Sequence, residues 1–271
     1  MVAPAYPIKH WSHSSLMAFL RNPLAWYKRY VEKIYDVPRN PSAVVGSAGH
    51  KALEHFYSGA PKDVAVKLGL EYLSAVPDGE LNLGVAKSAR AKRERRAKME
   101  ADYLRSIGFY LARAPRHKVV GVELRGTVAV PGLALPLTAV SDLVVESRIE
   151  PGAVDVVDHK FVDTFSKAGS GKTLFVMQAL FNYYVASELT GKPVRRFLVY
   201  ECKKSTNKDG SAQLKRYILD YAELGAEFAL FHRLINDASS EIARERLWLP
   251  NPSDMFEGEH SFDLYRLGLV S

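Results

Sequence analysis

The length and composition of this chain indicate one large folded domain, because 271 residues with 47% hydrophobic content can bury a sizeable core and exclude global disorder. Cys202 is the single cysteine, which excludes an internal disulfide framework and any zinc or iron–sulfur centre with several cysteine ligands. The 37 basic side chains outnumber the 30 acidic ones and give a formal charge of +7, which suits a polyanionic partner such as DNA.

No segment of the sequence predicts export or membrane insertion. No apolar run approaches the roughly 18 residues that span a bilayer. Residues 1–9 lack the apolar core of a signal peptide. We therefore expect a cytoplasmic protein without a membrane partner.

The N-terminal part, residues 1–113, predicts helices. Ser12 or Ser14 can cap a first helix, which Pro23 interrupts. Further helices are expected over about 46–56, 62–73 and 88–113. The last of these begins with six basic residues, Arg90, Lys92, Arg93, Arg95, Arg96 and Lys98. They form either a solvated helix face or a helix that contacts DNA phosphates near the substrate.

From Lys118 onward the sequence predicts an α/β core. Strands are expected over 119–130, 135–146, 154–160, 196–203 and 213–221, with helices over 174–189 and 221–243. This order predicts a mixed central sheet flanked by helices. We expect one domain over 1–271, with a helical part (1–113), a core sheet with its helix (114–221), and a C-terminal helix with an irregular tail (222–271).

The third predicted strand ends in an Asp-x-Lys pattern, Asp158-His159-Lys160. Residues two apart on a strand face the same side, so Asp158 and Lys160 project together. A carboxylate there can hold a hard divalent cation. A lysine beside it can orient or deprotonate a water and stabilise a charged transition state.

The preceding strand contains Asp142 within the apolar stretch 139–145. A charge in such a strand is costly unless it is paired or binds metal. Two neighbouring strands can therefore bring Asp142 and Asp158 close to one Mg²⁺ or Mn²⁺ ion. The alternative is that the two aspartates only pair with Lys160 or cap strand ends.

Three further side chains are candidates for the same site. A neutral His50 can give one nitrogen to a cation, and the backbone carbonyl of His159 can give an oxygen. Gln178 can position Lys160 or a phosphate by hydrogen bonds. The structural alternatives are a packed or solvated His50, and a helix in which Gln178 and Tyr183 only form a polar face.

Several segments follow one another in a characteristic order. They are the helical segment from Ser14 to Val31, the pattern Gly46-x-x-x-His50, Glu123, Asp142, Asp158-His159-Lys160, and Gln178 followed by Tyr183 and Tyr184. Over about residues 12–190 this order resembles the RecB-like exonuclease branch of the PD-(D/E)XK nucleases, which includes phage-type and CRISPR-associated exonucleases.

The resemblance implies a restriction-endonuclease-like fold and a Mg²⁺ or Mn²⁺ site. His50, Asp142, Asp158 and His159 would bind the cation. The catalytic set would be Asp142, Asp158, Lys160, Gln178 and Tyr183. The tyrosine stands five or six residues after Gln178 instead of the commoner four, which leaves Tyr183 and Tyr184 as alternatives. Asn22 occupies the position of a cluster cysteine, so no iron–sulfur cluster is expected.

A second glycine-rich pattern, Gly169-Ser170-Gly171-Lys172-Thr173, is similar to a phosphate-binding loop. The full pattern requires a glycine where Ser166 stands, and a buried strand before it. We therefore interpret residues 163–173 as a flexible loop over the active site.

The predicted function is a metal-dependent DNA exonuclease in DNA processing, recombination or repair. One alternative is a non-catalytic nucleic-acid-binding module on a nuclease fold. Another is a nuclease subunit that is active only with a helicase, annealing or recombination protein. Exonuclease and endonuclease action, polarity, strand preference and oligomeric state stay open at this point.

Overall fold

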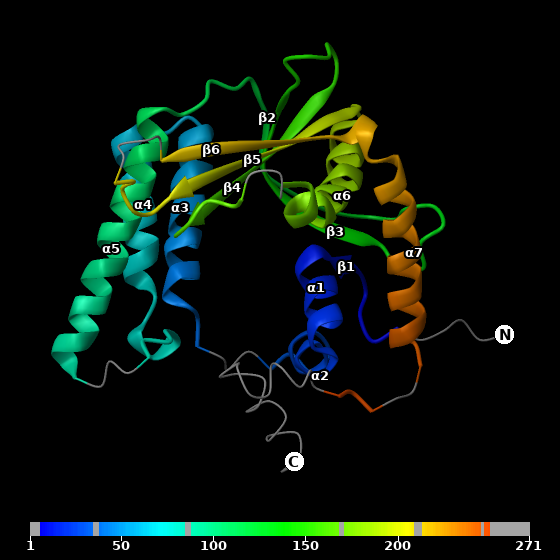
Figure 1. Ribbon diagram of the computed structural model, residues 1–271, viewed down its shortest axis with the longest axis horizontal. Coiled ribbons are helices and arrows are strands. Elements are labelled where there is room, and N and C mark those ends of the chain that lie inside the picture. Colours follow the sequence, from blue (N-terminus) through cyan, green and yellow to red (C-terminus); the bar gives the residue numbers. More distant parts are fainter. Residues whose placement is uncertain are drawn as a thin grey trace.

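The structure, a computed structural model, contains a mixed six-stranded sheet with helices packed against its faces (Figure 1). It describes residues 6–34, 38–84, 88–167, 171–208, 213–244 and 247–249. The expected α/β class with flanking helices is thus confirmed. The expected irregular tail beyond residue 249 lies outside the described residues.

The described elements follow the predicted order. The first half contains β1 (Trp11–Ser12), α1 (His13–Arg21), α2 (Pro23–Trp26), the π-helical turn η1 (Tyr27–Val31), α3 (Pro41–Tyr57), α4 (Lys62–Ala75), the 3₁₀ turn η2 (Asp78–Glu80) and α5 (Ala89–Ala112). The second half contains β2 (Val119–Val128), β3 (Leu137–Glu146), β4 (Val154–Val162), α6 (Gly171–Thr190), β5 (Val194–Lys203), β6 (Leu214–Asp220), η3 (Tyr221–Glu223) and α7 (Gly225–Ile242).

Polar side chains set the ends of the first two helices. Ser12 caps α1, because its side chain accepts a hydrogen bond from the backbone N of Ser15 at 3.2 Å. Asn22 caps α2 in the same way, by accepting from the backbone N of Ala25 at 3.0 Å, and Pro23 follows as the first helical residue. Asn22 therefore has a structural role as a helix cap.

Strand β3 is the centre of the sheet around which the site forms. The strand order is β1-β3-β4-β5-β6, and β2 also pairs with β3. The β1–β3 and β4–β5 pairs are parallel, while the other pairs are antiparallel. Because β2 pairs with β3 along 137–145, β1 and β4 divide the other edge of β3, at 137–138 and 143–146 respectively.

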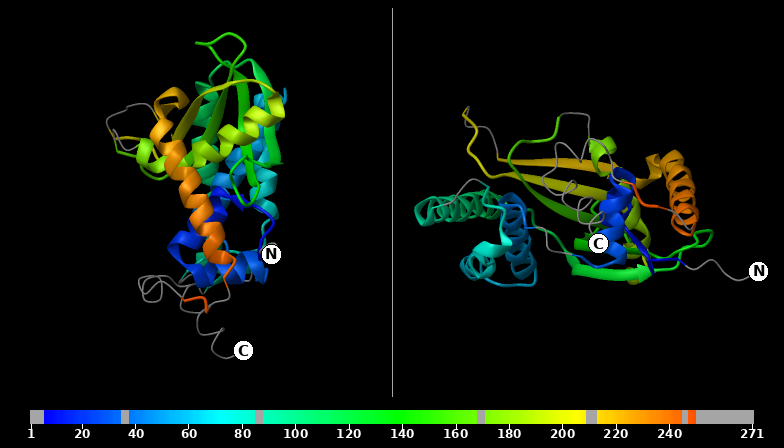
Figure 2. Two further views of the ribbon diagram at one scale, coloured as in Figure 1. Left: turned by 90° about the vertical axis from the view of Figure 1, so that its right-hand side faces the viewer. Right: turned by 90° about the horizontal axis from the view of Figure 1, so that it is seen from below.

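Two layers of helices cover the sheet, as the views in Figure 2 show. One hydrophobic cluster joins α3, α4 and α5 to β3, β4 and β5 through side chains such as Leu53, Ile107 and Leu198. A second joins α1, α6 and α7 to β3, and its fully buried members include Trp11, Trp26 and Phe181. Both clusters include residues of β3, and the site lies on β3 and β4 where the first cluster adjoins the second.

Two local features differ from the sequence predictions: a short additional strand and the start of α6. Strand β1, two residues long, was not predicted, because so short a segment carries no periodicity. Helix α6 begins at Gly171, so part of the glycine-rich segment belongs to a helix and not to a loop. Residues 168–170 of that segment lie outside the described residues.

Candidate metal centre

The two aspartates predicted for the site lie where β3 and β4 separate. The β3–β4 ladder ends at the pair Leu143 and Val157, so Asp142 and Asp158 are the next residues on each strand, beyond the last ladder pair. The side chain of Asp142 accepts a hydrogen bond from the backbone N of His159 at 2.7 Å. A carboxylate thus satisfies a strand amide at the point where the ladder stops.

Strand β2 changes direction opposite Asp142. The register pairs Val122 with Leu143 and Leu124 with Ser141, which places Glu123 across from Asp142. Glu123 has a left-handed backbone with φ 48°. As a result Val122 packs with the α3–α5 cluster and Leu124 packs against the α6 side of the sheet. The left-handed conformation lets Glu123 project from the strand, between Val122 on the α3–α5 side of the sheet and Leu124 on the α6 side.

Helix α3 brings His50 to the carboxylates. It can approach β4 closely because Gly49 has no side chain, and a Cβ atom there would collide with the Phe161 ring. His50 Nδ1 lies 3.2 Å from Asp142 Oδ2. The ligand atoms of His50, Glu123 and Asp142 all lie within 4.8 Å of one another.

This donor set suits a hard divalent cation. Two carboxylates and one imidazole converge at the side of an open cavity of about 530 Å³, which Arg125 and Lys51 also line. Such carboxylates repel one another without a counter-charge, and an ion would remove that repulsion. The His159 carbonyl fits the same set, because the N–H and C=O of one strand residue point to the same edge, here the edge that faces Asp142.

Asp158 belongs to a second group of contacts beside this donor set. Asp158 Oδ2 lies 2.8 Å from Lys160 Nζ, and Lys160 Nζ donates to Gln178 Oε1 at 3.0 Å. Gln178 Nε2 in turn donates to Asp158 Oδ1 at 2.5 Å. Asn182, one turn along α6, donates to the Gln178 carbonyl and accepts from Ser141 Oγ at 2.7 Å. The Lys160 ammonium is therefore held in place by α6.

The local charges shift the protonation of three groups. Burial alone would lower the pKa of His50, but the Asp142 carboxylate outweighs it and raises this pKa to about 9. Burial would raise the pKa of Asp142, whereas His50 and the hydrogen bond from His159 hold it well below its usual range. Burial raises the pKa of Asp158 despite Lys160, and the negative charge of Asp142 adds to that effect.

The side chain of His159 is buried beside Asp142, with Nδ1 3.6 Å from Asp142 Oδ2. It is 2% exposed, and its ring lies between Tyr57 and Tyr200 with interplanar angles of 18° and 24°. The Tyr110 hydroxyl lies 2.8 Å from His159 Nε2. This aromatic packing fixes the strand segment whose backbone N–H binds Asp142.

The structure brings together His50, Asp142, Asp158, His159, Lys160 and Gln178. Tyr183 lies elsewhere, since its ring packs on Tyr221 and Phe228 at 4.9 and 4.8 Å. Five residues of helix turn a side chain about 140° away from the direction of Gln178. Tyr184 also points to α7, where its hydroxyl lies 2.6 Å from His232 Nε2.

Two residues near the site had no role in the sequence analysis. Glu123 was named only as a member of the motif order, and its left-handed backbone is not readable from a residue pattern. His13 begins α1, and burial together with the nearby Lys160 charge lowers its pKa to about 4. His13 is therefore neutral near pH 7, and its ring lies against Phe181 of α6 at a centroid distance of 6.4 Å. The serine capping pattern located the helix but gave no reason to choose this histidine.

Diverging strands that carry Asp142 and an Asp-x-Lys pair, with a histidine-bearing helix above them, place the chain in the restriction-endonuclease-like class of α/β folds. The profile of the PD-(D/E)XK nuclease superfamily matches residues 10–254. The chain therefore belongs to this superfamily, whose nucleases use divalent metals.

The other comparisons are less informative. The search of curated proteins finds no match. Among solved structures, one described as "Crystal structure of SSO0001" aligns with 94% of this chain and 93% of its own, at 12% identity and a TM-score of 0.28. So low a score carries no argument about fold or function. In the described part of the chain, no helix is both long and apolar enough to cross a membrane.

Proposed function

We propose that this protein is a Mg²⁺- or Mn²⁺-dependent deoxyribonuclease that hydrolyses phosphodiester bonds, and that it acts as an exonuclease of the RecB-like branch. The observation that carries the proposal is the position of Lys160. Its ammonium lies between Asp158 and Gln178, beside the His50–Glu123–Asp142 donor set. A basic chain of this kind suits DNA as substrate.

The residues divide the chemistry between them. His50, Glu123, Asp142 and Asp158, with the carbonyl of His159, would hold the cation, which supplies Lewis-acid activation of a water and of the phosphate. Lys160 Nζ orients the attacking water and offsets the negative charge that develops on the phosphate oxygens. Gln178 keeps the ammonium in this position through its amide. A catalytic role for Tyr183 stays a prediction. Its ring packs on Tyr221 and Phe228 and not beside Lys160.

The proposal is tested by incubating end-labelled linear DNA and circular DNA with the protein in Mg²⁺, Mn²⁺ or EDTA. We expect cleavage of linear DNA with either ion and none with EDTA, whereas cutting of the circle would indicate an endonuclease. Lys160→Ala should lower the rate about 10²–10³-fold, because the transition state then lacks one electrostatic interaction. DNA affinity should change little, since the interaction is made chiefly in that state.

Lys67→Ala is a matched control, because Lys67 is 77% exposed on α4 and its charge is equal. Tight DNA binding without cleavage of any substrate would replace the nuclease with a non-catalytic binding module. Cleavage by Lys160→Ala at the unchanged rate would place the active site on other residues.

The cellular setting of the proposed activity follows from the RecB-like resemblance. We propose a role in DNA processing, recombination or repair in the cytoplasm, with a helicase, annealing or recombination protein as partner. Addition of such a partner to the cleavage assay should then raise the rate on linear DNA. An unchanged rate would favour a free-standing enzyme.

A further inference from the structure

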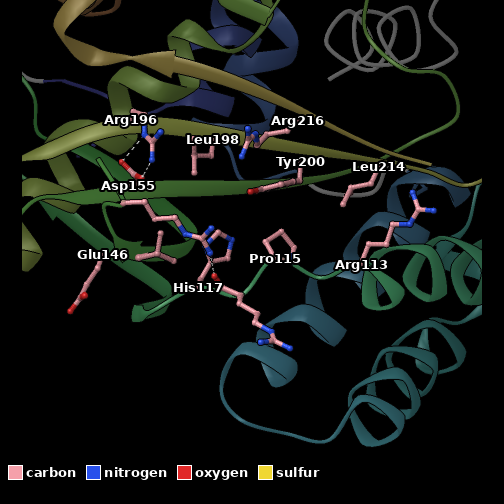
Figure 3. Close-up of a pocket in the computed structure, with 13 residues that line it drawn as sticks. Arg113, Pro115, His117, Glu146, Asp155, Arg196, Leu198, Tyr200, Leu214 and Arg216 are labelled. Atoms are coloured by element: carbon pink, nitrogen blue, oxygen red, sulfur yellow. Dashed lines mark hydrogen bonds and ion pairs between the residues drawn. The ribbon is translucent and has the colours of Figure 1, made fainter. Parts of the chain in front are cut away.

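A second cavity, of about 380 Å³, lies on the sheet face that α3 and α5 cover (Figure 3). Its floor consists of Val145, Leu198, Tyr200 and Leu214 from β3, β5 and β6. The segment between α5 and β2, with Pro115 and His117, forms one wall. The residues that line this cavity and those that line the metal cavity have no member in common. We call it the arginine pocket.

Five arginines line this pocket: Arg113, Arg116, Arg148, Arg196 and Arg216. Arg196 is neutralised by the buried Asp155, with Nε–Oδ1 and Nη2–Oδ2 distances of 3.2 and 2.6 Å. Among the described residues, the other four arginines form no ion pair with a carboxylate.

The remaining acidic side chain of the pocket does not balance this charge. Glu146 pairs with Lys118 at 3.3 Å, and Figure 3 shows its carboxylate pointing away from the other labelled residues. The same view places Arg196 and Arg216 on one side of the floor and His117 on the other. The cavity is therefore surrounded by several uncompensated positive charges.

His117 reports on the same positive field. Burial lowers its pKa, Arg148 and Arg216 lower it further, and the result is a pKa of about 4. The ring is therefore neutral near pH 7. Its Nε2 is buried and has no hydrogen-bond partner among the described residues. The pocket wall thus offers a neutral polar ring beside several guanidinium groups.

We propose that the arginine pocket binds the phosphate of a nucleotide unit, either a free nucleotide or a unit of a DNA strand. Guanidinium groups bind phosphate oxygens through paired hydrogen bonds, and four that form no ion pair with a described carboxylate line this one cavity, with Arg148 also donating to the Arg116 carbonyl. Leu198, Leu214 and Tyr200 in the floor of the cavity give the sugar and base an apolar surface to contact. A single phosphate ion would use only the charged part of this lining.

The proposal does not depend on the metal centre, so it is tested in EDTA, where cleavage is blocked. Calorimetric titrations use three probes: inorganic phosphate, deoxyadenosine monophosphate and a ten-nucleotide single strand. The test variant is Arg113→Gln with Arg216→Gln, because both side chains are exposed and their loss leaves the Arg196–Asp155 pair intact. The control is Arg233→Gln on α7, which removes one exposed charge at a residue that does not line the pocket.

We expect the test variant to bind the nucleotide probe at least about tenfold more weakly, since each charged hydrogen bond to phosphate contributes about that factor. The control should bind like the unchanged protein, and the melting temperatures of both variants should stay within a few degrees of it. If the mononucleotide shows the loss, the occupant is a free nucleotide. If only the ten-nucleotide strand shows it, the occupant is a DNA strand.

Two results would overturn the proposal. One is equal affinity of the test variant and the control for every probe. The other is inorganic phosphate binding as tightly as the nucleotide and the strand, because the apolar floor would then have no part. Both readouts are independent of DNA cleavage, so a failed nuclease assay and a failed pocket assay are distinguishable.

Discussion

At the scale of single residues, Glu123 combines backbone strain with a candidate ligand atom. A residue other than glycine in the left-handed region costs about 1–3 kcal/mol, and such residues concentrate at functional sites. Burial and the Asp142 charge also raise the pKa of Glu123, which shows that its carboxylate is held against a like charge. Both costs fall on one residue that faces His50 and Asp142. A bound cation would offset the second of them.

Replacing Glu123 therefore separates stability from metal binding. Glu123→Gly should raise the free energy of unfolding by about 1 kcal/mol, because glycine accepts the left-handed backbone without strain. It should also weaken Mn²⁺ binding by about tenfold or more. Glu123→Gln should weaken the binding similarly without the gain in stability. Thermal melts in EDTA and calorimetry measure the two effects. A glutamine variant with unchanged Mn²⁺ affinity would remove Glu123 from the ligand set.

His50 makes cation binding depend on pH. Its folded-state pKa of about 9 lies above the ordinary 6.5, so its pair with Asp142 stabilises the cation-free protein fully below about pH 6.5 and is lost as the pH rises through about 9. A cation needs the neutral imidazole and must expel this proton. We expect Mn²⁺ affinity to rise up to about tenfold per pH unit between pH 6.5 and 8.5. His50→Gln should bind more weakly and with a smaller slope, while a flat profile for the unchanged protein would contradict this role.

At the scale of elements, α3 positions His50 through its contact with β4. Gly49→Ala should destabilise the fold by about 1–3 kcal/mol, because the new methyl group collides with the buried Phe161 ring. The helix must shift outward, so Mn²⁺ affinity should fall as well. Gly46→Ala is the matched control on the same helix, since a Cβ there meets nothing within 4 Å. The control should keep its metal affinity and gain about 0.5–1 kcal/mol from helix propensity. Equal melting temperatures of the two variants would contradict the close contact.

The basic start of α5 divides into anchoring and free side chains. Arg96 donates to Asp78 at 2.7 Å and to the Val76 carbonyl, so it ties α5 to the end of α4. Two other basic residues form pairs one turn along the helix, Arg90 with Glu94 and Lys98 with Asp102. Arg90 and Lys98 therefore fit the first alternative of the sequence analysis, a solvated helix face.

Three exposed residues of α5 remain as candidates for phosphate contacts: Lys92, Arg93 and Arg95. Replacing all three by Ala should weaken DNA binding and reduce the salt dependence of the affinity, by about 0.9 in slope for each phosphate that is no longer neutralised. Filter binding or anisotropy between 50 and 200 mM salt measures this change. Lys67→Ala on α4 controls for the loss of one exposed charge outside α5. An unchanged slope would assign these side chains to solvent as well.

The sequence predicted the elements better than their contacts. Periodicity and turn residues located the helices and strands, and the motif order identified His50, Asp142, Lys160 and Gln178, which the structure brings together. The direction of Tyr183, about 140° from Gln178, follows from its five-residue spacing on a helix, but its partners could not be predicted, because they depend on how α7 packs on α6. The face change of β2 at Glu123 depends equally on packing from two sides of the sheet.

At the scale of the whole molecule, the candidate site joins parts of the chain that are far apart. Its residues come from α3, β2, β3, β4 and α6, and α1 adds His13. No single segment can hold the cation alone, so binding energy acts on the fold as a whole. The two hydrophobic clusters meet near this point through β3.

The divided edge of β3 has a consequence for hydrogen exchange. Among the described strands, residues 139–142 have a neighbour only in β2, whereas residues 196–202 of β5 are paired with both β4 and β6. Amides of 139–142 that point to the open edge should exchange with deuterium faster than those of β5, although they lie in the middle of the sheet.

Cation binding should slow this exchange selectively. At a Mn²⁺ concentration 100 times its dissociation constant the linkage is about 2.7 kcal/mol, which corresponds to about a 100-fold slower opening. Exchange measured by mass spectrometry with and without Mn²⁺ gives the comparison, and uniformly slow exchange along β3 would contradict it. The middle of a central strand would then contain the amides that exchange first and that the cation protects, while the amides at its two ends exchange only when the whole molecule unfolds.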